Sequence, residues 1–241
     1  MDAKQFYDEK QLTLRSLVEG DKVRNTHNFI KSVIIKKFVG KRKKILDLGC
    51  GQGGDLLKIK ITSPSFYVGV DISHTAILAA QKRFSNIKLN CRSHFLCYDF
   101  TSHSWDGYPP YDVVNCQFAI QFAFKNEQSA NYTIEKISTS LVEDGFFIGT
   151  VPQHTNVSTY DDIEVLLPDD ERKCTECVVE INDLVKICEK YELHVILIEK
   201  FDAFFEYNKK EECDLAEKMK AFVAPDPNNS VFVFQKRTQN T

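Results

Sequence analysis

The feature that most constrains this chain is a glycine-rich turn between an apolar run and a helical pattern. Residues 44–48 (KILDL) form the apolar run, and Gly49, Gly51 and Gly54 follow with the spacing G-x-G-x-x-G. An acidic residue, Asp71, ends the next apolar run about 20 positions after the turn. A turn that joins a strand to a helix in this way is typical of cofactor sites at the carboxyl ends of strands in doubly wound sheets.

The remainder of the chain alternates strand-like and helix-like runs, which predicts an α/β fold with one doubly wound sheet. Strands are expected at 44–48, 66–70, 91–98, 111–116, 145–151, 178–181, 194–198 and 231–234. Helices are expected at 3–17, 25–39, 55–60, 73–84, 127–141, 183–191 and 210–222. We expect a single domain over 1–241, with an N-terminal helical arm at 1–40 and a lid-like insertion at 152–175 after the fifth strand.

Composition excludes several other classes of protein. The 241 residues are 43% hydrophobic and 27% charged, with 18 Phe and 9 Tyr, which suits a globular core. No apolar stretch reaches the roughly 18 residues of a membrane span, and the polar opening MDAKQFYDEKQ is unlike a secretory signal. We therefore expect an intracellular protein without a membrane partner. The eight cysteines lie mostly in apolar runs, and Cys174-x-x-Cys177 lacks a second ligand pair, so no metal site is expected.

Charge is distributed unevenly along the chain, although the net charge is only −3. Residues 22–44 carry basic side chains and no Asp or Glu, whereas acidic residues outnumber basic ones over 161–214. Either run is compatible with an ordinary solvated surface. The basic run directly precedes the glycine turn, which is a suitable position for an anionic substrate such as RNA.

Asp47 helps to distinguish between the cofactors that such a turn can hold. A dinucleotide would bring a pyrophosphate to the helix N-terminus, where a carboxylate just before Gly49 would repel it. S-adenosylmethionine (SAM) carries an ammonium and a sulfonium and no phosphate, so the same carboxylate favours SAM. Asp71 is expected to accept hydrogen bonds from the ribose hydroxyls, and Asp99 from the adenine amino group. The open alternatives are a capping or surface carboxylate at Asp47 and Asp71 and an Asx turn at Asp99.

Several segments, taken together, resemble one family. The string ILDLGCGQGGDLLK at 45–58 resembles the SAM motif of eukaryotic and viral mRNA cap guanine-N7 methyltransferases. Further segments similar to that family are RNTHNFIK at 24–31, CQFAIQFAF at 116–124, FFIGTVP at 146–152, CTECVV at 174–179 and FDAFFE at 201–206. The resemblance covers about residues 3–236. It implies a class I SAM methyltransferase fold with a mostly parallel seven-stranded sheet, SAM as the cofactor, and methyl transfer to guanine N7 of the RNA 5′ cap.

The resemblance also assigns roles to particular residues. It places Lys31, Gly49, Asp71, Asp99 and Gln117 at the cofactor. The glycine turn adds Asp47 and Gly51 to the cofactor site. Phe122 is expected to contact the cofactor, and its ring is expected to contact the cap as well. Contacts to the cap guanine fall on Asn28, Phe118, Gln121 and Glu176. Lys31 would lie near the methionine carboxylate, and Glu176 would accept from the guanine N1 and N2 donors. The alternatives are a solvated lysine at Lys31 and core packing of Phe118, Phe122 and Phe124.

The chain departs from the family pattern at the cap-binding positions. Gln121-Phe122 stand where the family has His-Tyr, His27 replaces an Asn, and Asn229 falls near an aromatic position. Loss of one base–aromatic stack would cost about 1–3 kcal/mol. The alternative to cap methylation is therefore a SAM-binding paralogue with another acceptor, or a non-catalytic subunit of a capping complex.

No residue is assigned as a general acid or base, because guanine N7 is a lone-pair nucleophile. The expected partners are a capped RNA 5′ end and an RNA triphosphatase, a guanylyltransferase or an activating subunit. The chain has no K-x-D-G motif for guanylyl transfer. A nuclear location is favoured over a cytoplasmic one.

Overall fold

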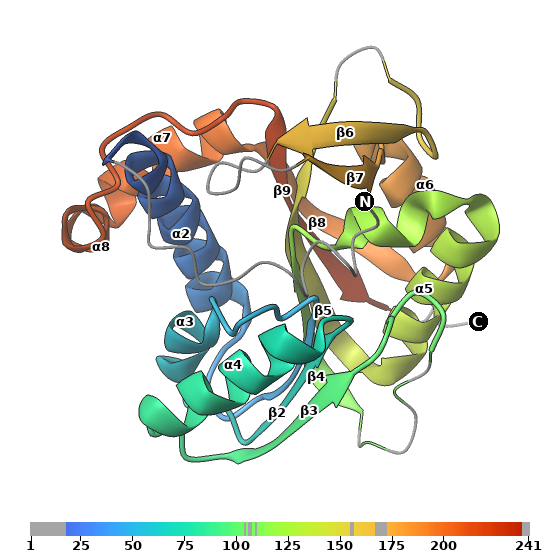
Figure 1. Ribbon diagram of the computed structural model, residues 1–241, viewed down its shortest axis with the longest axis horizontal. Coiled ribbons are helices and arrows are strands. Elements are labelled where there is room, and N and C mark those ends of the chain that lie inside the picture. The colour runs from blue at the N-terminus through green and yellow to red at the C-terminus, as the bar shows by residue number, and fades with distance from the viewer. Residues whose placement is uncertain are drawn as a thin grey trace.

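The structure is a computed structural model, and it describes residues 18–103, 105, 108, 110–154, 157–166 and 173–237. Its centre is a seven-stranded sheet in the order β3 (Arg92–Cys97), β2 (Phe66–Asp71), β1 (Lys44–Leu48), β4 (Tyr111–Gln117), β5 (Leu141–Pro152), β9 (Asn229–Lys236) and β8 (Leu193–Lys200) (Figure 1). The helices are α2 (Val18–Phe38), α3 (Leu56–Lys60), α4 (His74–Asn86), the 3₁₀ helix η1 (Ile120–Lys125), α5 (Glu127–Ser140), α6 (Ile181–Lys190), α7 (Phe201–Glu211) and α8 (Cys213–Lys218).

Most strands of the sheet are parallel, as the sequence predicted. β1 pairs in parallel with β2 and with β4, and the outer pairs β2–β3 and β4–β5 are parallel too. Only β9 is antiparallel to its neighbours, β5 and β8. The strand order reverses between β1 and β4, and the crevice outside the carboxyl ends of strands at such a reversal is where doubly wound sheets bind ligands.

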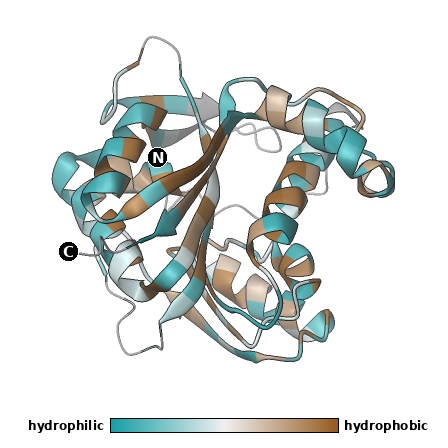
Figure 2. Ribbon diagram, turned by 180° about the vertical axis from the view of Figure 1, so that it is seen from behind, coloured by the Kyte–Doolittle hydropathy of each residue, from teal (hydrophilic) through white to brown (hydrophobic). Residues whose placement is uncertain are grey.

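Alternating side chains of the strands enter two cores, one on each face of the sheet. On β1, Ile45 packs with α2 and α7, whereas Leu46 packs with α5 and α6. Both residues are fully buried. Figure 2 shows hydrophobic residues concentrated along the central strands and on the helix sides that face them. Burial on both faces explains why the strands read as nearly continuous apolar runs in the sequence.

A second, two-stranded antiparallel sheet follows β5. It consists of β6 (Asp162–Leu166) and β7 (Lys173–Cys177), with Ile163 opposite Glu176. Its strand β7 contacts η1, so this small sheet lies beside the segment that follows β4. The strand expected at 178–181 is therefore wrong in position: the pairing partner is the polar stretch before it, and α6 begins at Ile181.

The single helix expected at 210–222 is also wrong. The structure has α7 from Phe201, followed by the short α8. Phe201, Phe204, Phe205 and Asn208 are buried at the i, i+3, i+4, i+7 spacing of one helix face. The helix expected at 25–39 exists, but α2 already begins at Val18. The helix expected at 3–17 lies outside the described residues.

Within the part of the chain that the structure describes, none of the helices combines the length and the hydrophobicity needed to cross a membrane.

Candidate functional site

The glycine turn after β1 forms a tight loop at the carboxyl end of the sheet. Gly49, Gly51 and Gly53 all have positive φ values, of 67°, 51° and 73°. A Cβ on Gly49 would collide with Ala119, and one on Gly53 would lie 2.5 Å from Leu56 and 3.3 Å from the main chain of Ala80. By contrast, a Cβ on Gly51 would enter open space, so its backbone is accessible to a ligand.

The third glycine that the structure requires is not the one in the G-x-G-x-x-G spacing. Gly54 has no positive φ, and a Cβ there would meet nothing within 4 Å. Gly53 carries the constraint, and spacing alone did not reveal it. The neighbouring Gly-Gly pair was the only signal in the sequence.

Asp71 fixes this loop to the end of β2. Its Oδ2 accepts a hydrogen bond from the Gly51 N–H at 2.8 Å, and its Oδ1 accepts from the Ser73 N–H at 2.9 Å. Ser73 is in turn the N-cap of α4. The Asp71 carboxylate therefore lies directly beside the backbone of Gly51. The predicted proximity of Asp71 to the glycine turn is present.

Asp99 follows β3 on the same edge of the sheet. Its Oδ1 accepts from the Thr101 N–H at 2.8 Å, which is the Asx turn considered as an alternative. Its Oδ2 lies 3.9 Å from Nζ of Lys125. β2 and β3 are in register with Asp71 opposite Cys97, so Asp99 emerges just beyond Asp71.

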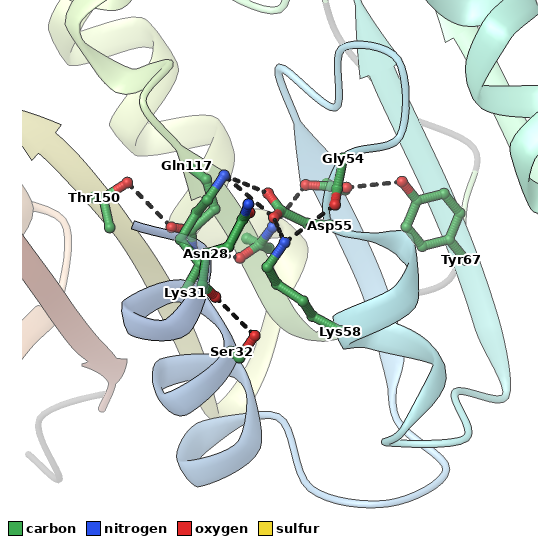
Figure 3. Close-up of polar contacts among 11 residues, drawn as sticks. Asn28, Lys31, Ser32, Gly54, Asp55, Lys58, Tyr67, Gln117 and Thr150 are labelled. Carbon is green, nitrogen blue, oxygen red and sulfur yellow. Dashed lines mark hydrogen bonds and ion pairs between the residues drawn. The ribbon is translucent and has the colours of Figure 1, made fainter. Parts of the chain in front are cut away.

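A chain of buried hydrogen bonds links four adjacent strands beneath the site. Tyr67 Oη donates to Asp47 Oδ2 at 2.7 Å, and Asn115 Nδ2 donates to Asp47 Oδ1 at 2.7 Å. Gln117 Nε2 donates to Asn115 Oδ1 at 2.8 Å, and Thr150 Oγ1 donates to Gln117 Oε1 at 3.1 Å. Figure 3 shows Tyr67, Gln117 and Thr150 in this region. These bonds fix the side chains of Asp47 and Gln117 from within the sheet.

Asp47 is difficult to ionise in this position. Burial, followed by the nearby carboxylate of Asp55, raises the pKa of Asp47 to about 7, although the hydrogen bonds from Tyr67 and Asn115 act in the opposite direction. Asp47 therefore acts on the site through the position of β1, since both of its oxygens accept hydrogen bonds within the sheet.

Asp55 and two lysines form a compact ion cluster between α2 and α3 (Figure 3). Lys31 Nζ lies 3.2 Å from Asp55 Oδ1, and Lys58 Nζ lies 2.8 Å from the same oxygen. Burial disfavours the charged carboxylate, but the two ammonium groups outweigh it and lower the pKa of Asp55 to about 2. Lys58 also donates to the Gly54 carbonyl at 3.1 Å. Lys31 is thus held beside the glycine turn rather than in solvent.

Asp55 and Lys58 were not singled out from the sequence. The signal was their i, i+3 spacing on a helix start, in the DLLK portion of the string at 45–58.

Three rings form a cluster under the end of β4. Phe118 has a positive φ of 56°, and its N–H donates to the Thr150 carbonyl at 2.9 Å. Its ring is stacked on His27 at 5.7 Å and meets Phe201 edge-on at 5.8 Å. Lys31 Nζ lies 5.9 Å from the Phe118 centroid. Packing therefore accounts for part of what Phe118 does, as the core-packing alternative proposed.

His27 is neutral at physiological pH. Burial, followed by the charge of Lys31, lowers its pKa to about 4. Among the described residues, its buried Nε2 has no hydrogen-bond partner.

The structure brings together Gln121 and Glu176, which are 55 positions apart. Gln121 Nε2 donates to the Phe118 carbonyl at 3.1 Å and to Glu176 Oε2 at 3.2 Å. Its Oε1 is buried and has no partner in the described part of the chain. Glu176 is only 6% exposed, and burial raises its pKa, which the bond from Gln121 partly offsets. Two buried acceptors thus lie side by side.

The two other predicted residues lie at the same edge. Phe122, on η1, is half-buried and packs against the core on the α5 side. Asn28 is half-buried on α2, and Figure 3 shows it beside Lys31. In the described stretches, no three or more His, Cys, Asp or Glu side chains are grouped as a metal site would require.

Comparison with known proteins identifies related sequences. A family model described as the mRNA (guanine-N(7))-methyltransferase domain matches residues 4–164. An mRNA cap guanine-N(7) methyltransferase of Eremothecium gossypii is 38% identical over 54% of this chain and 33% of its own length. The corresponding protein of Saccharomyces cerevisiae is 32% identical over 62% of this chain and 37% of its own length. The mRNA cap guanine-N(7) methyltransferase 1 of Arabidopsis thaliana is 26% identical over 79% of this chain and 64% of its own length. The chain thus spans about a third of the length of the two fungal relatives named here.

Solved structures share the fold at low sequence identity. The CcbJ methyltransferase of Streptomyces caelestis superposes with a TM-score of 0.63 at 13% identity, covering 98% of this chain and 97% of that one. A SAM-dependent methyltransferase from Mesorhizobium loti superposes with a TM-score of 0.58 at 12% identity, covering 82% of this chain and 92% of that one. The [4+2]-cyclase SpnF gives 0.62 at 14% identity, covering 88% and 82%. The fold is that of class I methyltransferases, as the sequence predicted, and the cyclase shows that this fold does not by itself specify methyl transfer.

Proposed function

The chain belongs to the mRNA (guanine-N7)-methyltransferase domain family, and from this premise we propose that it transfers the methyl group of SAM to N7 of the guanine that caps RNA. The single observation that best supports this acceptor is the pair of buried acceptors at Gln121 and Glu176. Oε1 of Gln121 has no partner among the described residues, and Glu176 is a buried carboxylate with a raised pKa. The Gln121 oxygen requires a donor, and Glu176, which accepts from Gln121 at one oxygen, can accept from further donors.

Guanine supplies donors in the required arrangement. Its Watson–Crick edge presents the N1–H and the N2 amino group side by side, and an adenine edge does not offer two adjacent donors. Gln121 lies on η1 and Glu176 on β7, and together they would hold the Watson–Crick edge of the base. N7 lies on the other edge of the guanine ring. A base held in this way leaves N7 unobstructed for reaction.

The residues at the glycine turn suit SAM as the cofactor. The open space over Gly51 admits a ligand close to the backbone, and the Asp71 carboxylate lies beside it. An ionised Asp47 beneath the turn is unfavourable for a pyrophosphate and favourable for a cation, whereas the charge of Asp55 is already paired with Lys31 and Lys58. Lys31 would exchange its contact with Asp55 for the carboxylate of the methionine part. We assign Asp99 and Gln117 to the adenine side and Phe122 to the wall between the two ligands.

In this proposal the chain positions its substrates and transfers no proton. SAM, when bound, supplies an electrophilic methyl group on a sulfonium. Guanine N7 has a lone pair at neutral pH, so no side chain is needed as a base. Holding the two reactants in line can account for roughly 7–11 kcal/mol of the barrier. The buried chain from Tyr67 to Thr150 supplies the rigidity that such positioning needs, because each of its members is fixed by a neighbour.

Two variants separate the proposed cofactor and cap roles. Asp71→Ala should abolish SAM binding in calorimetry. Glu176→Gln should leave SAM affinity unchanged and reduce turnover of the cap analogue GpppG by at least tenfold, since it replaces a carboxylate acceptor with a mixed amide. Glu180→Gln, an exposed glutamate nearby in the chain, is the matched control. Equal loss of SAM binding in Asp71→Ala and Glu176→Gln would contradict the division of roles.

The partners and the location follow from the same proposal. Capped RNA is the substrate, and the triphosphatase and guanylyltransferase steps that make the cap would come from other proteins or from a subunit that activates this one. A protein that acts on nascent transcripts would work inside the cell, with the nucleus favoured.

The substitutions at Gln121, Phe122, His27 and Asn229 support a second candidate, a SAM-binding paralogue that has lost or changed cap activity. SAM binding without turnover of any capped RNA would favour that candidate.

A further inference from the structure

One surface of the protein has a strongly one-sided charge. It comprises the outer sides of α3 and α4 and the starts of β1 and β3, and we call it the basic face. Its exposed basic residues are Lys41, Arg42, Lys43, Lys60, Lys82, Arg83, Lys88 and Arg92; Lys43 pairs with Asp112, at the start of β4, at 3.0 Å. In the segments 41–65 and 74–95 the only acidic residues are Asp47 and Asp55, and both are buried. Every formal charge that these segments expose to solvent is therefore positive.

Printed contacts show that these residues form one surface. Lys60, at the end of α3, donates to the carbonyl of Ile87, next to Lys88, at 2.6 Å. Lys41 donates to the carbonyl of Ile61 at 3.2 Å. Lys44 and Arg92 are both in register with Phe66 on the strand between them, so they are about 10 Å apart. Figure 1 shows α3, α4 and β3 together on one side of the molecule.

The outer side of α4 connects this cluster to the candidate site. His74, Leu78 and Lys82 are exposed at successive four-residue intervals. The helix begins next to Asp71 and spans about 20 Å over its 13 residues. A polyanion can therefore run along α4 from His74 to Lys88 and Arg92, a stretch that contains no acidic residue.

The positive charge of the basic face contrasts with the charge of the rest of the protein. The protein as a whole has a net charge of −3. Exposed acidic residues cluster elsewhere, for example Glu211, Asp214 and Glu217 on α7 and α8. In the part of the chain that the structure describes, Lys82, Lys88 and Arg92 have no carboxylate partner. Unpaired cations of this kind remain available to phosphates.

The basic face also carries apolar side chains. Leu57, Ile61 and Leu78 are 60%, 51% and 52% exposed. Aliphatic side chains between lysines offer contact area to riboses and bases while the ammonium groups meet the phosphates. This combination suits a flexible single strand.

We propose that the basic face binds the phosphates of the RNA chain downstream of the cap. This inference rests on the proposed function, because it is the capped RNA that brings a polyanion to the site. RNA binds along α4 and over the starts of β1 and β3, and its length, rather than its sequence, determines the contribution to affinity.

The test removes three charges from the basic face by Lys82→Gln, Lys88→Gln and Arg92→Gln together. The control removes the same charge elsewhere by Lys186→Gln, Lys210→Gln and Lys218→Gln, on α6, α7 and α8. Affinity and KM are measured for GpppG and for a capped oligonucleotide at several salt concentrations, and circular dichroism checks folding. Single strands give a slope of about −0.7 per phosphate contact, so three contacts are worth about a hundredfold at 0.1 M salt.

We expect the basic-face variant to lose about a hundredfold in affinity for the oligonucleotide, with a salt slope shallower by about 2. GpppG should be unaffected, and the control variant should resemble the unmodified protein. Unchanged oligonucleotide affinity would overturn the inference, as would equal losses for both substrates. Absence of GpppG turnover in the unmodified protein would instead contradict the proposed function, since affinity for RNA is measured separately.

Discussion

Replacing Asp47 with Asn should remove a pH dependence from the stability of this protein. Asp47 is buried under the site, and its pKa is raised from an ordinary value of 3.8 to about 7. The unfolded chain releases the proton near pH 3.8, whereas the folded protein retains it up to about pH 7. The folded state therefore binds more protons between these values, and the stability that Asp47 contributes is lost as pH rises through this window.

The size of the effect follows from the two pKa values. Their difference corresponds to on the order of 4 kcal/mol in total, of which about 3 kcal/mol falls between pH 5 and pH 8. Asn at this position can accept from Asn115 and donate to the oxygen of Tyr67, so it preserves the hydrogen-bond chain without a titrating proton. Relative to the variant, the unmodified protein should therefore become less stable by about 3 kcal/mol over this range.

Urea unfolding at several pH values measures this difference, with Asp183→Asn as the control. The hydrogen bonds from Lys186 and Thr159 hold the pKa of Asp183 below its ordinary value, so its contribution is present above that ordinary value and is lost only as pH falls below it. Asp183→Asn should therefore change stability by an amount that stays constant from pH 5 to pH 8. Parallel pH profiles for Asp47→Asn and the unmodified protein would refute the reasoning, because they would mean that Asp47 does not titrate in this window.

Three further outcomes are expected. Gly53→Ala should destabilise the protein by about 1–3 kcal/mol in thermal unfolding, since its φ is positive and its Cβ would contact Leu56, whereas Gly54→Ala should have little effect; equal losses would contradict this. The pKa of His27 is lowered to about 4, so the unmodified protein should lose stability relative to His27→Asn as pH falls from 6.5 towards 4, and a constant difference would argue against a buried neutral ring. Gln121→Glu should weaken GpppG binding at least tenfold at pH 8, and less at pH 5, because it places a second carboxylate beside Glu176 in the proposed cap site. Calorimetry at both pH values measures this, and equal affinities for the variant and the unmodified protein at pH 8 would contradict it.

Local patterns predicted the sheet and the cofactor edge well. β1 lies at 44–48 as expected, and β2 and β4 each extend one residue beyond the expected strands. These strands are buried on both faces, so their apolar runs stand out in the sequence. The glycine turn and Asp71 belong to one strand-helix-strand unit, formed by β1, α3 and β2, and the geometry of that unit brings them together. Proximity at the cofactor edge thus follows from local sequence.

Contacts made by tertiary packing were less accessible. The roles of Asp55 and Lys58 depend on α2 lying across α3, which no periodicity encodes. The strand expected at 178–181 was misplaced because those residues are more apolar than β7, which is held by pairing with β6. The neighbourhood of Gln121 and Glu176 was reached only through the family resemblance, because the two lie on elements joined by a long connection.

The most direct test of the proposed function is transfer of labelled methyl from SAM to GpppRNA, with m7GpppRNA and uncapped pppRNA run in parallel and the product digested to nucleosides. The expected result is label on GpppRNA alone, recovered as 7-methylguanosine. Absence of label on all three RNAs, with SAM binding demonstrated by calorimetry, would contradict cap methylation and favour the non-catalytic or altered-acceptor paralogue.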